Sequence, residues 1–195
     1  MTKEKINSFS DYRFFINKDL KSQGGGHFMK KFVTSPIYRF TVLLRFNEYL
    51  INTKKNLIIR LIPLHWYKRL SVKLSFSIPF NVFSYGPGIV HYGLLIVNPK
   101  TRIGKNCRIH AGVNIGASAG FLNFGDTSSY APKIGDNCYI GPGSKIFGPI
   151  LIGNNCVIGA NAVVNKSFEK DNITIGGIPA KIISKYGSEG LVYNI

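Results

Sequence analysis

A six-residue period in the second half of the chain constrains the fold more than any other feature. An aliphatic residue returns every six positions, and four places after most of these lies a small or β-branched residue. The aliphatic positions are Val97, Ile103, Ile109, Ile115, Ile134, Ile140, Ile146, Ile152, Ile158 and Val164. A period of six fits neither the 3.6 residues of a helical turn nor the alternation of a flat strand. It is typical of a parallel β-helix, in which each aliphatic side chain stacks on its copy one coil away.

The repeats divide the chain into three parts. We expect a helical N-terminal region over residues 1–75, a β-helix over 76–185 and a C-terminal tail over 186–195. The period fails between residues 117 and 133, which predicts a loop that protrudes from the coil. The predicted fold class is therefore mainly β, with an α-helical cap on the N-terminal end of the coil.

The helical region shows three amphipathic or apolar runs. Residues 8–21 and 35–52 each begin near a serine that can cap a helix, and residues 54–74 form a third segment. Pro63 is expected to kink or split that segment. The glycines at 24–26 predict a loose joint after the first helix.

The net charge of +16 lies mostly in the first part of the chain. Residues 1–75 hold fifteen basic and four acidic residues, a balance of +11, and residues 76–195 hold ten and five, a balance of +5. This charge suits a polyanionic partner, but no nucleic-acid-binding motif is present, so we do not expect nucleic acid to bind. Residues 54–74 mix apolar side chains with six basic ones, which is compatible with peripheral contact with an anionic membrane. Packing against the coil or a partner subunit is the interpretation we favour.

The three cysteines occupy one repeated position. Cys107, Cys138 and Cys156 each follow an Ile-Gly-X-Asn sequence, which places all three at the same inward corner. We interpret them as small apolar filler and not as a metal site or a nucleophile. With no disulfide framework and no secretory signal at the N-terminus, the expected location is the cytoplasm.

Three segments resemble known enzymes. Residues 86–99, GPGIVHYGLLIVNP, and residues 134–148, IGDNCYIGPGSKIFG, resemble the serine acetyltransferase-like hexapeptide acyltransferases. Residues 177–181, GIPAK, are similar to that family's C-terminal segment beside coenzyme A, and the resemblance covers residues 77–185. It implies a left-handed coil, a homotrimer with active sites between neighbouring coils, and acetyl-CoA as the donor.

The resemblance assigns the catalytic role to His91. Transfer of an acetyl group to an alcohol requires a base for the alcohol proton, and imidazole suits this role near neutral pH. His110 stands where glycine otherwise follows the aliphatic residue, so it is either a substrate contact or a surface residue. No Asp or Glu occurs between residues 49 and 125. The candidates that would orient His91 are therefore a backbone carbonyl, Asn98, Asn81 or, from the loop, Asp126.

The acceptor pocket departs from the pattern of serine acetyltransferases. Tyr130 and Ala131 stand where the family has an Arg-His pair, and Val90 replaces an acid beside the histidine. We therefore expect a sugar or polysaccharide-precursor hydroxyl as the acceptor, with Tyr130 as a candidate contact. The alternatives are a serine O-acetyltransferase of cysteine biosynthesis, a non-catalytic hexapeptide scaffold, and a carbonic-anhydrase-like metalloenzyme. A metalloenzyme of this kind needs three histidines on adjoining coils, and the coil region holds only His91 and His110. We therefore expect no metal.

The cofactor candidates lie in the later coils and in the C-terminal segment. Lysines there can serve the phosphates of coenzyme A, and small residues can line the slot for its pantetheine arm. The candidates are Gly141, Gly159, Ala160, Lys166, Ala180, Lys181 and Lys185.

Overall fold

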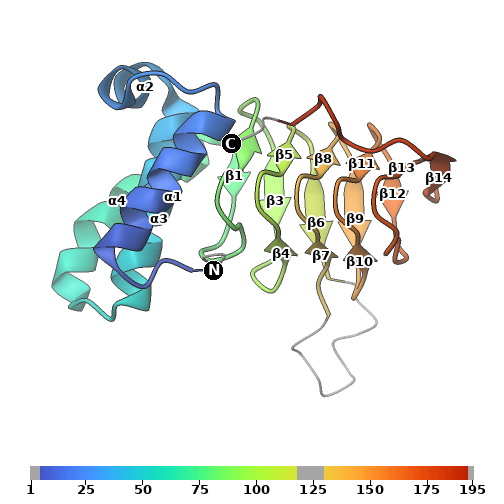
Figure 1. Cartoon of the computed structure of the whole chain (residues 1–195). Helices are drawn as coiled ribbons and strands as arrows, with labels where there is room; N and C mark the ends of the chain where they lie inside the picture. The colour runs from blue at the N-terminus through green and yellow to red at the C-terminus, as the bar shows by residue number, and fades with distance from the viewer. Residues whose placement is uncertain (1–4, 118–129, 193–195) are drawn as a thin grey trace.

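The computed structural model describes residues 5–117 and 130–192, which form a helical cap followed by a three-sided coil (Figure 1). The helices of the cap are α1 (Phe9–Ser22), α2 (Phe28–Thr34), α3 (Pro36–Asn52) and α4 (Leu57–Leu74). The strands are β1 (Phe76–Ser77), β2 (Gly88–Ile89), β3 (Leu95–Val97), β4 (Arg102–Ile103), β5 (Arg108–Ile109), β6 (Asn114–Gly116), β7 (Lys133–Ile134), β8 (Tyr139–Ile140), β9 (Lys145–Phe147), β10 (Leu151–Ile152), β11 (Val157–Ile158), β12 (Val163–Val164), β13 (Thr174–Gly176) and β14 (Lys181–Ser184). The cap lies at the end of the coil where the first strands begin.

The coil is built from three sheets of short strands. Their orders are β1-β3-β6-β9-β12, β10-β7-β4 and β14-β13-β11-β8-β5-β2, and among the strands of the described residues only the β13–β14 pair is antiparallel. Ile140 pairs with Ile158, which is eighteen residues later, as three hexads per coil require. All the aliphatic residues of the repeat are buried. The predicted parallel β-helix is therefore confirmed.

Asparagines close one corner of each coil. Asn106, Asn137 and Asn155 adopt positive φ angles of 54–56°, which asparagine tolerates better than most residues. The Nδ2 of Asn106 donates to Oδ1 of Asn137 over 3.1 Å, and Nδ2 of Asn137 donates to Oδ1 of Asn155 over 2.9 Å. This ladder links three successive coils along the axis.

The cysteines stack inside the coil beside this ladder. All three are free and buried, and Sγ of Cys138 donates to the carbonyl of Gly153 over 3.2 Å. The hydrogen bond with Cys107, followed by burial, raises the pKa of the Cys138 thiol well above its ordinary value. A thiol held protonated and out of solvent is a poor nucleophile, which supports the interpretation of these residues as filler.

The cap differs from the sequence prediction in two places. An additional short helix, α2, follows the glycine joint, and α4 is a single helix that contains Pro63. The helix continues through Pro63 because α3 packs along it, and Nδ2 of Asn47 donates to the carbonyl of Pro63 over 3.2 Å. Tertiary packing here outweighs the poor helix propensity of proline.

A buried ion network joins the cap to the coil. Arg45 of α3 is fully buried, and its side chain contacts Oδ2 of Asp19 at 2.8 Å and Oε2 of Glu48 at 2.9 Å. The guanidinium also donates to the carbonyls of Phe83 and Ser84 in the first coil. These bonds fix the cap on the entrance of the coil, directly before the segment that contains His91.

The C-terminal tail runs back along the coil toward the cap (Figure 1). The backbone N–H of Ser188 donates to the carbonyl of Asn155 over 3.0 Å, and Nη1 of Arg108 donates to the carbonyl of Leu191 over 3.2 Å. The described part of the tail therefore ends beside β5, in the early coils.

Candidate functional site

His91 lies at an enlarged corner of the first coil. Val97 follows Ile89 by eight positions, whereas the matching step in the next coil is six. The two extra residues leave the coil between β2 and β3, and His91 and Tyr92 are exposed there. This insertion explains why an imidazole projects from the coil at this point.

His110 lies beside His91 on the adjacent coil. It follows Ile109, the pairing partner of Ile89, and the centroids of the two imidazole rings are 6.2 Å apart. Its ring also packs on Tyr139 at 4.8 Å. The Nε2 of His110 is buried and has no hydrogen-bond partner within residues 5–117 and 130–192. From the sequence, His110 is either a substrate contact or a surface residue, and the structure places it half-buried next to His91.

The electrostatic surroundings of His110 are positive. Burial lowers its pKa from the ordinary value, and the charges of Arg108 and His91 lower it further. Its imidazole is therefore neutral at pH 7, with one ring nitrogen able to donate and the other able to accept.

A small cavity of about 190 Å³ opens between the cap and the first coils. It is lined by Ser22, Gln23, Lys31, Ser35, Ile37, Gly88, Ile89, Val90 and Arg108. The lining holds two cations, Lys31 and Arg108, and no acid, so it suits a negatively charged group. Val90 directly precedes His91, which places the cavity next to the candidate base.

Neither of these cations could be recognised from a motif in the sequence. Arg108 could have been found from strand alternation, because residues two apart point to the same face and His110 already pointed outward. Lys31 had no such signal, since α2 was not predicted and its position depends on how the cap docks.

The two asparagines proposed to orient His91 are engaged elsewhere. Both amide atoms of Asn81 bond to Asn52, and its backbone N–H donates to Oε1 of Glu48 over 2.7 Å. The Oδ1 of Asn98 accepts from the backbone N–H of Lys100 and closes the turn after β3. Asn81 is therefore part of the cap interface, and a role in orienting the His91 ring stays a prediction. The side chain of Asn98 stabilises its own turn, and no contact with His91 is found in the described residues.

The loop candidates lie at a different corner. The loop joins β6 to β7, whereas His91 stands between β2 and β3, at the other end of the face formed by β3 and β6. Tyr130 is half-buried at the end of the loop. Asp126 lies outside the described residues. Within a single subunit, Tyr130 therefore does not lie next to His91.

The small residues proposed for the pantetheine slot follow His110 along the axis. The N–H of Gly141 donates to the carbonyl of Ile158, and that of Gly159 donates to the carbonyl of Ile175. A Cβ at Gly141 would lie 2.6 Å from the Ile158 oxygen, so only glycine fits. Ala160 is exposed at the same edge. Along the axis from His110, the coil surface therefore carries no side chain at Gly141 and Gly159. The N–H groups of these two glycines are used in hydrogen bonds between coils.

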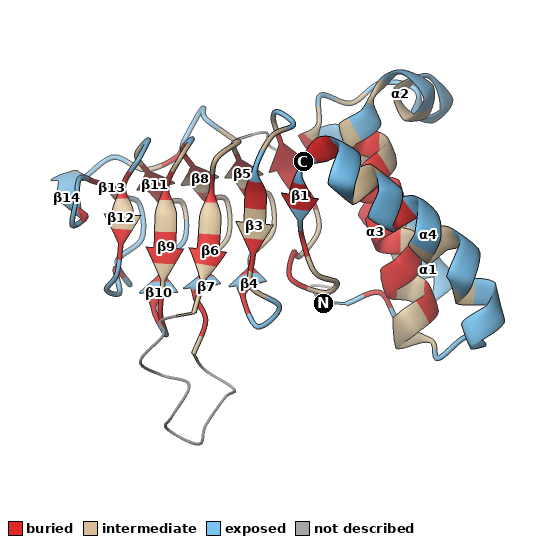
Figure 2. Cartoon of the chain, turned by 180° about the vertical axis from the view of Figure 1, so that it is seen from behind, coloured by how far each residue is buried: buried red, intermediate tan, exposed pale blue. Residues whose placement is uncertain are grey.

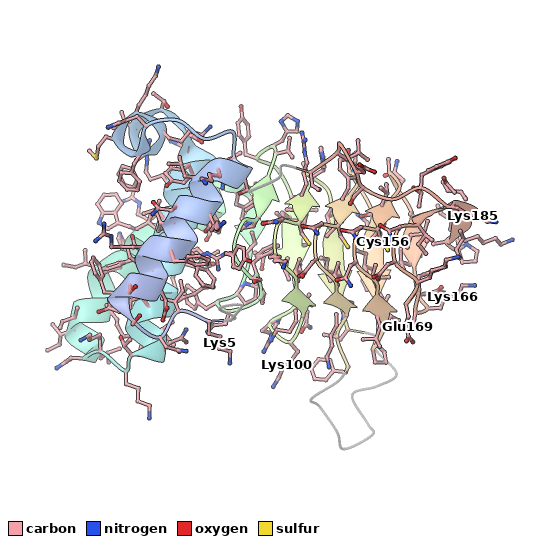
Figure 3. The ribbon with its side chains drawn as sticks, viewed as in Figure 1. Lys5, Lys100, Cys156, Lys166, Glu169 and Lys185 are labelled. Carbon is pink, nitrogen blue, oxygen red and sulfur yellow. The ribbon has the colours of Figure 1, made fainter. Side chains whose placement is uncertain are left out.

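The lysine candidates gather at the far end of the coil. Figure 3 shows Lys166 and Lys185 at the end opposite the helices, and Lys181 begins β14 there. All three lysines are exposed, and Nζ of Lys166 lies 5.4 Å from the centroid of the Phe168 ring. Ala180 is buried, and its N–H donates to the carbonyl of Val163. Ala180 therefore anchors the segment that carries Lys181.

The residues that the structure describes contain no group of three or more His, Cys, Asp or Glu side chains that could hold a metal ion. Within them His91 and His110 form a pair without a third ligand, so the arrangement suits proton transfer better than metal binding.

Sequence comparison finds hexapeptide repeats in this coil. Residues 131–166 match the family described as bacterial transferase hexapeptide (six repeats). The chain is 30% identical over 146 residues to a serine acetyltransferase of Buchnera aphidicola, covering 74% of this chain and 50% of that protein. It is 35% identical over 88 residues to the bifunctional protein GlmU of a Psychrobacter species, covering 40% and 19% of the two chains. The chain thus spans half or less of these curated relatives.

Solved structures share the whole fold. A serine acetyltransferase of Brucella abortus superimposes with a TM-score of 0.72 at 22% identity, covering 91% of this chain and 71% of that chain. Another from the same organism, in complex with coenzyme A, gives a TM-score of 0.67 at 25% identity, covering 92% and 69%. These neighbours confirm the left-handed β-helix with an N-terminal helical cap. The chain therefore contains bacterial transferase hexapeptide repeats and is similar in fold to these serine acetyltransferases.

Proposed function

We propose that this protein is an acetyl-CoA-dependent O-acetyltransferase that uses His91 as its general base. The observation that carries the proposal is the two-residue insertion that exposes His91 beside a neutral His110, above a glycine-lined edge of the coil. The relatives named serine acetyltransferases support the same activity.

In the proposed reaction, His91 takes the proton of the acceptor alcohol while its oxygen attacks the thioester carbonyl of acetyl-CoA. The C–S bond of the tetrahedral intermediate then breaks, and the thiolate leaving group receives the proton from the imidazolium. His110, whose ring lies 6.2 Å from that of His91, would line the acceptor site from the adjacent coil. A neutral imidazole suits this role because it adds no charge beside the base.

The donor would lie along the edge that runs from β2 to β13. The strand order β2-β5-β8-β11-β13 contains four steps, which span roughly 19 Å at the usual strand spacing. An extended pantetheine arm fits such a path, with Gly141 and Gly159 allowing close approach and Lys181 near the far end for the phosphates. The Brucella abortus neighbour was solved in complex with coenzyme A, which supports acetyl-CoA as the donor.

For the acceptor, the serine of the named relatives is the best-supported choice. The cavity beside Val90 offers Lys31 and Arg108 to a carboxylate. A sugar acceptor is the second candidate, because none of the residues that line this cavity is an acid that could bind the ammonium group of an amino acid. Lys31 and Arg108 would suit a sugar that carries a phosphate or a carboxylate.

We also propose a homotrimer. His91 and the loop that contains Tyr130 lie at different corners of one chain, so a neighbouring coil is needed to bring such a loop to the histidine. A cytoplasmic location is proposed as well, since three buried free thiols fit a reducing compartment.

The experiment measures coenzyme A thiol release from acetyl-CoA with serine and with a panel of neutral and phosphorylated sugars. His91→Asn should lower turnover about 10²–10⁴-fold, whereas His27→Asn, at an exposed position in the cap, should leave it unchanged. Release that survives in His91→Asn would contradict the role of the base. No release with any acceptor would favour the scaffold.

A further inference from the structure

Helix α4 is covered by the rest of the chain along only one side. The residues that face α3 recur with helical spacing at Pro63, Tyr67, Leu70 and Leu74. The remaining surface of the helix is also largely apolar. A helix that is apolar all round is normally buried, in a core or in a membrane.

The uncovered side of α4 combines large apolar side chains with cations. The apolar residues are Leu57, Ile58, Ile59, Leu61, Ile62, Trp66 and Val72, all of them more than half exposed. The exposed cations around them are Lys54, Lys55, Lys68, Arg69 and Lys73. We call these two sets together the α4 surface. Figure 2 shows the outer side of α4 as exposed, facing away from the coil.

The cations decide between the possible occupants of this surface. No acid occurs between residues 49 and 125, and Glu48 is buried in its bond with Arg45. Two copies packed through α4 would bring ten cations together without acidic partners, which is electrostatically unfavourable. An anionic lipid surface supplies the missing negative charge and an apolar layer for the isoleucines and Trp66.

We propose that the α4 surface docks the protein peripherally on an anionic membrane. No helix in the described part of the chain is long and apolar enough to cross a bilayer, so α4 lies in the interface with its apolar side chains inserted. The lysine and arginine heads reach the phosphate layer, and the guanidinium of Arg69, 6.0 Å from the Trp66 ring, lies at the boundary between the two.

Docking through α4 would leave the coil directed away from the membrane, since the exposed side of α4 faces away from the coil. The inference does not depend on acetyl transfer, and the two can fail separately.

The test is flotation of the full chain with vesicles of phosphatidylcholine alone and with 30% phosphatidylglycerol. Binding is expected only with the anionic vesicles and should weaken at high salt. Ile58→Asp/Ile62→Asp, at two of the most exposed positions of α4, should abolish it. Neutralising Lys68, Arg69 and Lys73 to Gln should lower the partition coefficient about a hundredfold, about fivefold for each charge.

The matched control is Met29→Asp/Val33→Asp, which changes two exposed apolar residues on α2 and should float like the wild type. Circular dichroism of each variant verifies the fold. Absence of flotation with anionic vesicles, or flotation that the α4 variants leave unchanged, would overturn the proposal. So would sedimentation data in which the α4 variants dissociate a larger oligomer without altering lipid binding.

Discussion

The coil and the helical cap are stabilised in different ways. In the coil, the same contacts recur every eighteen residues: aliphatic side chains stack inside, asparagines bond along one corner and thiols fill the space beside them. In the cap, one buried arginine with two carboxylates holds three segments that are far apart in sequence. A repeated contact can be lost locally, whereas a single network fails as a unit.

The largest expected effect comes from Arg45→Ala. Its removal leaves Asp19 and Glu48 buried without a counter-charge, and we expect a loss of about 4 kcal/mol in the free energy of unfolding. Arg13→Ala, at an exposed position on α1, should change it by less than about 0.5 kcal/mol. Urea unfolding of both variants measures the difference.

Hydrogen exchange then tests where the Arg45 variant is damaged. Protection should fall in α1 and α3 and persist in β8 and β11, because strands of the later coils contact only their neighbours. An equal loss of protection along the whole coil would show that cap and coil unfold together, and the coil would then not be stabilised locally.

Ile140→Ala should lower the free energy of unfolding by about 3 kcal/mol, somewhat less than Arg45→Ala. The substitution leaves a cavity between the stacked Ile109 and Ile158. The loss of hydrogen-exchange protection should centre on β5, β8 and β11, and the cap should keep its own. Leu151→Ala, on an outward-facing and partly exposed side chain, is the control and should have a much smaller effect. Loss of protection in α1 and α3 would contradict a locally stabilised coil.

The same difference explains which parts of the fold the sequence could predict. In a repeat, the same residue pattern makes the same contacts in every coil, so the inward positions, such as Ile109 and Cys138, could be assigned from spacing alone. The cap network appears once. The i,i+3 spacing of Arg45 and Glu48 on one helix allows them to meet, but nothing in the spacing indicates that Asp19 joins them. Helix α2 is too short to have a clear periodic pattern.

The candidate site lies at the junction of the cap and the coil, and only part of it could be predicted from the sequence. His91 was identified from a motif, and the structure adds that the insertion after Ile89 exposes it. The bonds of Asn81 to Glu48 and Asn52 could not be predicted, because both partners belong to the cap. Lys31 was missed for the same reason. Residues whose position depends on docking between distant segments carry little local signal in the sequence.

A third prediction concerns the asparagine corner of the coil. Asn137→Ala should cost about 1–2 kcal/mol for its left-handed backbone, in addition to the two ladder bonds. Asn137→Gly loses the same bonds without the conformational penalty, so it should be the milder change by about 1 kcal/mol. Thermal or urea unfolding of the pair separates the two contributions. If both variants are equally destabilised, the ladder bonds and not the backbone conformation fix this corner.

The smallest expected effect is a pH dependence that arises at His110. Its pKa is lowered in the folded protein by burial and by Arg108 and His91, so the unfolded chain binds the proton more readily. The free energy of unfolding therefore rises with pH while His110 titrates. The stability that the neutral imidazole contributes is lost as the pH falls below about 6.5, the ordinary pKa of histidine. Unfolding of the wild type and His110→Gln between pH 5 and 8 measures it, and the wild type should lose more stability on the acid side. A variant with the same acid-side slope would place the titrating group elsewhere, and the carboxylates of the cap would then be the next residues to test.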